Sequence, residues 1–238
     1  MSGHSKWKTI QHKKGAADAA RGRIFSKLSR EIMVVARQGG GDPSTNITLR
    51  SLIQKAKSAN MPADNIERAI KKGTGEIEGQ VFEEITYEGY AGGGVAFIVN
   101  VLTDNRNRSA AEIRHIFTKH NSSFATQGAV TRNFERKGQI LVDVNAVEED
   151  VLMDVILEAG ADDMSQDGDQ FEVLVDPSIF SDVCDAIEKA SVPTLSAEVT
   201  LLPLATASVS DPAIASAVLR FYNALDENDD VQNIYMNM

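Results

Sequence analysis

The stretch of sequence that decides the fold spans residues 138–202 and reads GQILVDVNAVEEDVLMDVILEAGADDMSQDGDQFEVLVDPSIFSDVCDAIEKASVPTLSAEVTLL. Short apolar runs alternate in it with longer segments whose apolar residues recur at helical spacing. An Asp-Gly pair marks a tight turn between two of the short runs. The pattern predicts strands at 139–144 and 195–202, two strands flanking residues 167–168, and helices at 148–159 and 178–190. This β-α-β-β-α-β order is typical of a ferredoxin-like α/β domain.

The segments on either side of this stretch are predicted to belong together. The preceding segment predicts strands at 82–87 and 95–102 around a glycine-rich turn, then a helix at 107–120 and a strand at 129–134. The following segment predicts a helix at 211–225 and a strand at 231–235. Because the first set lacks the helix and strand that the second offers, we expect one discontinuous α/β domain, also ferredoxin-like, made of residues 77–132 and 207–238.

The first third of the chain has a helical period instead. Apolar residues fall on one face from residue 18 onward, and again in two shorter segments at 49–56 and 63–72. Residues 1–17 show neither a helical nor a strand period, so we expect them to form a mobile arm. The sequence thus predicts an α+β protein of three domains: a basic arm with a three-helix domain (1–76), the discontinuous domain, and an acidic ferredoxin-like domain (133–206).

Charge is distributed very unevenly along the chain. The 238 residues carry a formal net charge of −10. Residues 1–75 nevertheless hold 15 Lys and Arg against 5 Asp and Glu, whereas residues 138–238 hold 2 against 21. A basic module on an acidic protein indicates a polyanionic partner such as nucleic acid. The acidic end is expected to be a solvated surface.

The basic module also carries the only tryptophan of the chain, Trp7, next to histidines that could stack on bases. Two alternatives stay open: a lysine-rich helical domain without a ligand, and a Trp7 ring that docks onto the helices. Lysines and arginines would pair with phosphates. The candidate nucleic-acid contacts are His4, Lys6, Trp7, Lys8, His12, Lys13, Lys14, Arg21, Arg23, Lys27, Arg30, Lys55 and Lys57.

Catalytic and cofactor motifs are not found. The glycines of 89–94 are followed by neither a Gly-Lys-Ser/Thr ending nor a helix, so they predict a hairpin turn. His115 and His120 are five residues apart, which is not metal-ligand spacing on a helix. The lone cysteine, Cys184, falls on an apolar helix face and is expected to pack in a core. We therefore expect no enzyme activity, no cofactor and no metal site.

Several short motifs are distributed along the whole chain: Gly3-His4-Ser5-Lys6-Trp7, His12-Lys13-Lys14, Arg21-Gly22, Asn60-Met61-Pro62, Tyr87-Glu88-Gly89-Tyr90, Thr103-Asp104-Asn105-Arg106-Asn107-Arg108 and Asp229-Asp230-Val231-Gln232-Asn233. In these motifs the sequence resembles the YebC/PmpR family along nearly its whole length. Three stretches depart from the family pattern, namely Ser122-Ser123, Thr131-Arg132-Asn133 and Met236. The resemblance implies a cleft-containing protein of three domains with a helical N-terminal domain.

Members of this family are mostly described as DNA-binding regulators of transcription. Others, with a similar mitochondrial activator of cytochrome oxidase translation, act on ribosomes, for example by relieving stalling at proline runs. Our first hypothesis is a non-enzymatic nucleic-acid-binding regulator of gene expression. The resemblance favours DNA, whereas a flexible basic arm suits irregular RNA slightly better. The alternative within it is a ribosome-associated translation factor that binds ribosomal RNA.

Two other hypotheses remain. The acidic domain could dock a basic partner such as a ribosomal protein. A hydrolase could use the polar cluster of Asp104, Asn105 and Arg108, although such residues more often cap the next helix. A single cysteine, the lack of a run of about 20 apolar residues and the lack of a secretory core lead us to expect a cytoplasmic protein without a membrane partner. We also expect a monomer.

Overall fold

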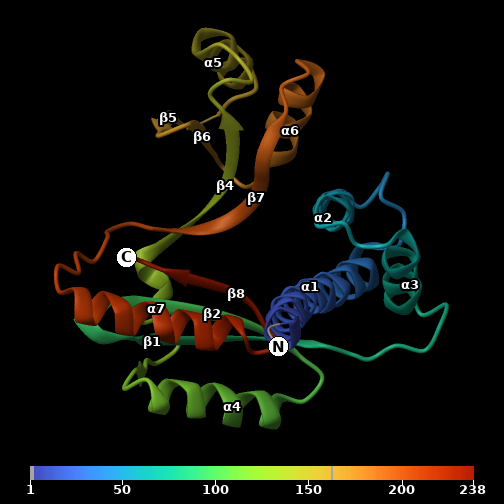
Figure 1. Cartoon of the computed structure of the whole chain (residues 1–238). Coiled ribbons are helices and arrows are strands. Elements are labelled where there is room, and N and C mark those ends of the chain that lie inside the picture. The colour runs from blue at the N-terminus through green and yellow to red at the C-terminus, as the bar shows by residue number, and fades with distance from the viewer. Residues whose placement is uncertain (1–2, 162) are drawn as a thin grey trace. The chain divides into compact units, whose positions relative to one another are not determined.

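A computed structural model describes residues 3–161 and 163–238, with side chains described for 21–161 and 164–238. The chain divides into two compact units (Figure 1). One unit is Met1–Thr126 with Ser208–Ile234, and the other is Gln127–Ala207 with Tyr235–Met238. The α+β class predicted from the sequence is confirmed. The exact boundaries of the three predicted domains stay a prediction.

The first unit begins with three helices, α1 (Gly3–Gly39), α2 (Ile47–Ser58) and α3 (Ala63–Thr74). The prediction that the chain is not helical before residue 18 is wrong, because α1 begins at Gly3. Residues 4–20 contain no proline and a single glycine, and they are rich in Ala and Lys, which are strong helix formers. Helix propensity without an apolar face explains why periodicity missed this part of the helix.

Helix α3 passes through Gly73 instead of stopping there as predicted. It ends at Thr74 and is capped by Gly75, whose φ of 82° is left-handed. Gly73 is buried under α1. A Cβ atom there would lie 2.5 Å from the carbonyl oxygen of Met33 and 2.8 Å from the Cβ of Ala36. The glycine therefore allows α1 and α3 to approach each other closely.

Gly73→Ala is expected to destabilise the helical part by about 1–3 kcal/mol, because the added methyl forces the two helix backbones apart. Urea unfolding followed by circular dichroism measures the loss. Gly22→Ala is the matched control, since a Cβ at this exposed position of α1 meets nothing within 4 Å. That control should be neutral or slightly stabilising. Equal stability of Gly73→Ala and the wild type would contradict the close approach.

The same unit contains a four-stranded sheet in the order β3-β1-β2-β8. Strands β1 (Glu83–Tyr90) and β2 (Ala96–Thr103) are antiparallel, in register from Glu83 opposite Thr103 to Tyr90 opposite Ala96. The α/β part of this unit also contains the helices α4 (Arg106–Lys119) and α7 (Pro212–Asp226). Strand β8 (Val231–Met236) comes from the end of the chain and lies next to β2.

Three aromatic rings join the sheet to its two helices. The ring of Phe221 on α7 lies 4.9 Å from that of Phe97 on β2 and 4.8 Å from that of Phe117 on α4, both edge to face. All three side chains are almost fully buried. Edge-to-face aromatic contacts add to the free energy of burial. The C-terminal segment is therefore built into the core of the first unit.

The strand predicted at 129–134 is wrong. Residues Thr131–Asn133 form a 3-10 turn, and Phe134 begins β4 (Phe134–Asp143) of the second sheet. The edge strand of the first sheet is instead β3 (Ser123–Phe124). Two residues are too few to produce an alternating pattern, so no sequence period could reveal β3.

The second unit contains the predicted β-α-β-β-α-β order. After β4 come α5 (Glu149–Glu158), β5 (Asp163–Asp167), β6 (Gln170–Val175), α6 (Phe180–Lys189) and β7 (Thr194–Pro203). The strand order is β5-β6-β4-β7, and each neighbouring pair is antiparallel. Cys184 packs against the apolar core of this unit, as expected. The ferredoxin-like prediction for this stretch is confirmed.

Candidate nucleic-acid interface

Helix α1 carries most of the predicted contacts. Their positions divide into two groups, of which the first has side chains outside the described ones: His4, Lys6, Trp7, Lys8, His12, Lys13 and Lys14. The second group lies among the described side chains of α1 and at the end of α2: Arg21, Arg23, Lys27, Arg30, Lys55 and Lys57. The backbone of the first group belongs to the same helix as Arg21, Arg23, Lys27 and Arg30.

Three cations of α1 share one face, because Arg23, Lys27 and Arg30 are spaced four and then three residues apart. Of these, Lys27 and Arg30 contact acidic residues near the end of the chain. The Lys27 ammonium is 2.8 Å from the carboxylate of Asp226 and donates to its main-chain carbonyl at 3.0 Å. This face of α1 therefore meets the end of α7, a segment 199 residues away in sequence.

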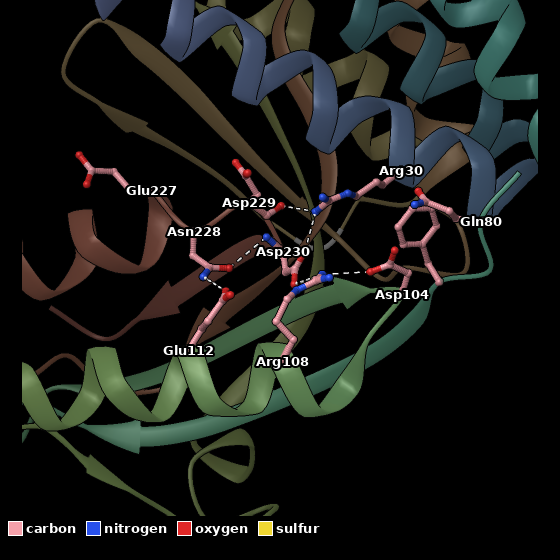
Figure 2. Close-up of a pocket in the computed structure, with 10 residues that line it drawn as sticks. Arg30, Gln80, Asp104, Arg108, Glu112, Glu227, Asn228, Asp229 and Asp230 are labelled. Atoms are coloured by element: carbon pink, nitrogen blue, oxygen red, sulfur yellow. Dashed lines mark hydrogen bonds and ion pairs between the residues drawn. The ribbon is translucent and has the colours of Figure 1, made fainter.

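Arg30 makes a second set of contacts with the same region. Its guanidinium is 3.1 Å from the carboxylate of Asp230 and donates to the main-chain carbonyl of Asp229. It also lies 5.6 Å from the ring centroid of Phe82, a cation–π distance. Figure 2 shows Arg30 reaching from α1 toward Asp229 and Asp230. We call residues 226–230 the acidic segment, since Asp226, Glu227, Asp229 and Asp230 are four of its five residues.

Asp230 is the centre of a hydrogen-bond network, and its side chain is only 4% exposed. Besides Arg30, its carboxylate accepts from Arg108 at 2.9 Å, from the Ser109 hydroxyl at 2.6 Å and from the Thr103 hydroxyl at 3.2 Å. Burial alone would raise the pKa of Asp230, but the hydrogen bonds from Ser109 and Arg108 and the charges of Arg108 and Arg30 lower it below its ordinary value of 3.8. The group is therefore held as a carboxylate.

The polar residues at the start of α4, Asp104, Asn105 and Arg108, stabilise the beginning of this helix. The Asn105 side chain caps the helix by accepting from the amide of Arg108. Asp104 is 3.0 Å from the Arg108 guanidinium, one helical turn away. The pKa of Arg108 is raised, first by its hydrogen bond to Asp230 and then by that to Asp104. Capping and ion pairing account for the residues on which the hydrolase hypothesis depended.

A pocket of about 470 Å³ opens beside this network (Figure 2). Five carboxylates and two guanidinium groups dominate its walls. Among the described residues, no group of three or more His, Cys, Asp or Glu side chains is placed to hold a metal ion. The lining residues are Arg30, Gln80, Phe82, Asp104, Arg108, Glu112, Glu227, Asn228, Asp229 and Asp230.

Sequence reasoning did not assign the acidic segment to the site. A signal for it does exist, because four acids in five residues surround the C-terminal end of a predicted helix. The helix dipole disfavours anions at that end, so cations from elsewhere in the fold are expected nearby. Which cations these are depends on contacts between distant residues.

In the part of the chain that the structure describes, no helix is both long and apolar enough to cross a membrane.

The sequence matches known proteins along nearly its whole length. Residues 5–76 match the family model described as the TACO1/YebC protein N-terminal domain, and residues 82–238 match that of the TACO1/YebC second and third domain. A probable transcriptional regulatory protein of Geobacter sulfurreducens is 52% identical over 237 residues, covering 100% of this chain and 95% of the relative. One from Rubrobacter xylanophilus is 54% identical over 238 residues, with the same coverage.

A solved structure agrees with these matches. The crystal structure of a conserved hypothetical protein from Aquifex aeolicus superposes with a TM-score of 0.82 at 47% identity, covering 92% of this chain and 90% of that one. The relatives are named as regulatory proteins of transcription. The chain belongs to the TACO1/YebC family.

Proposed function

We propose that this protein is a nucleic-acid-binding regulator of gene expression, and that helix α1 carries the main contact. One observation supports this most strongly. The 37 residues of α1 contain 9 Lys and Arg against 2 Asp and Glu, in a chain whose net charge is −10. A straight helix of this length extends about 55 Å and would follow a phosphate backbone over many nucleotides.

The helical state of α1 bears on which polymer it suits. The slight preference for RNA depended on residues 1–17 being a mobile arm without helical structure, whereas residues 3–17 are part of α1. The major groove of B-form DNA admits an α-helix, whereas the major groove of A-form RNA is too narrow for side-chain readout. Together with the names of the relatives, this favours DNA and a role in transcription. Binding to ribosomal RNA is the competing outcome.

Crosslinking in cells followed by sequencing of the bound nucleic acid tests this proposal. We expect promoter DNA to be enriched over a mock sample, and the enrichment to be lost when Lys6, Lys8, Lys13 and Lys14 are replaced by alanine. Enrichment of ribosomal RNA instead would assign the protein to translation. Recovery of neither polymer above the mock sample would contradict nucleic-acid binding.

A further inference from the structure

We propose that the acidic segment is an internal competitor of nucleic acid: it occupies Lys27 and Arg30 with oxygen atoms where phosphate oxygens would otherwise bind. This inference depends on the proposed function and describes how the same site is regulated. Nucleic acid that engages the full length of α1 must displace these contacts. The protein alone therefore holds part of its basic surface in an inhibited state.

The contacts resemble those that a phosphate backbone makes. Lys27 is bound by one carboxylate oxygen and one carbonyl oxygen of Asp226, and Arg30 by the Asp230 carboxylate and the Asp229 carbonyl. Each cation thus faces two oxygen atoms, at least one of them anionic. Phosphate offers anionic oxygens to lysine and arginine in the same way. A phosphate group could therefore replace either pair of oxygens.

Asp226, the acid of this segment that belongs to α7, does not stabilise that helix. Asp226 is the last residue of α7, and no basic residue lies in the last turn of this helix. An anion at a helix C-terminus is unfavourable because the carbonyl ends already carry negative charge. The side chain of Asp226 is also 58% exposed, so it is not needed for core packing. Its charge is compensated from outside the helix, by Lys27.

The network has one permanent half and one replaceable half. Asp230 keeps Arg108, Ser109 and Thr103 as partners whether or not Arg30 is present, and these all lie within the α/β part of the unit. The α1 half depends on Lys27 and Arg30, whose side chains are 15% and 20% exposed, and on Asp226, whose side chain is 58% exposed. Release of α1 would therefore leave the buried Asp230 paired. Such an arrangement suits a contact that opens and closes.

The test compares binding of the full chain to two fluorescein-labelled probes, a 25-base-pair DNA duplex and a ribosomal RNA hairpin, by fluorescence anisotropy. Asp226→Asn should raise the affinity for the bound probe about fivefold, since it removes an ion pair, exposed on the Asp226 side, that binding must break. Asp226→Lys should raise it further. The control is Glu158→Gln, which removes the same charge from an exposed acid that also ends a helix, α5. It should change affinity less than twofold.

A double-mutant cycle separates the inference from general charge effects. If the acidic segment acts by covering Lys27, the gain from Asp226→Asn should disappear when Lys27→Ala is also present. Equal affinity of the wild type and Asp226→Asn, or the same gain in the Lys27→Ala background, would overturn the inference and leave the proposed function standing. Binding of neither probe by any variant would overturn the proposed function and the inference together.

Discussion

Replacing Lys6, Lys8, Lys13 and Lys14 with alanine is expected to weaken binding to nucleic acid about a thousandfold at 0.1 M salt. The reason is the release of counterions: about six neutralised phosphates on duplex DNA predict a slope of roughly −5 for log K against log salt. Four contacts fewer should leave a slope near −2. Titrations between 50 and 200 mM salt measure both slopes.

The substitutions should leave α1 helical, because alanine has the highest helix propensity. Circular dichroism checks this directly. Lys119→Ala with Lys189→Ala is the control, since these two exposed lysines end α4 and α6. The control should keep a slope close to that of the wild type. An unchanged slope in the fourfold variant would show that the first turns of α1 do not contact phosphate.

Asp230→Ala is expected to have the largest effect on stability, a loss of about 3 kcal/mol. The substitution removes the carboxylate that accepts from the buried hydroxyls of Ser109 and Thr103. The same carboxylate forms the ion pairs with Arg108 and with Arg30, which are lost as well. Chemical denaturation of the full chain measures the free energy of unfolding. Asp104→Ala is the control: its carboxylate contacts the same arginine but is 31% exposed, so a loss below about 1 kcal/mol is expected.

Acid provides an independent check of the same carboxylate. Because folding lowers the pKa of Asp230, its contribution is complete above the ordinary value of 3.8 and is lost as the pH falls through the lowered value. Asp230→Asn cannot titrate, so the difference in stability between it and the wild type should shrink below pH 4. A difference that stays constant there would show that Asp230 does not hold the network as a carboxylate.

Periodicity predicted the structure best where each element buries one face. The ferredoxin-like order from β4 to β7 follows from apolar residues such as Ile140, Leu152, Val173 and Ile187, all buried in one core. It failed for residues 3–17, a part of α1 whose sequence has no apolar helical period, and for the two-residue strand β3. A pattern can report an element only when burial on one side selects its residues.

The amino-acid sequence by itself determined the α+β class, the helical N-terminal region, the ferredoxin-like order of residues 134–203 and the concentration of positive charge in the first 75 residues. These properties depend on local spacing and on composition. Only the tertiary structure decided that Lys27 and Arg30 meet the acidic segment and that Asp230 is buried among Thr103, Arg108 and Ser109. Those contacts join residues more than 100 positions apart, and their partners are chosen by the packing of α1, α4 and α7, which no local pattern encodes.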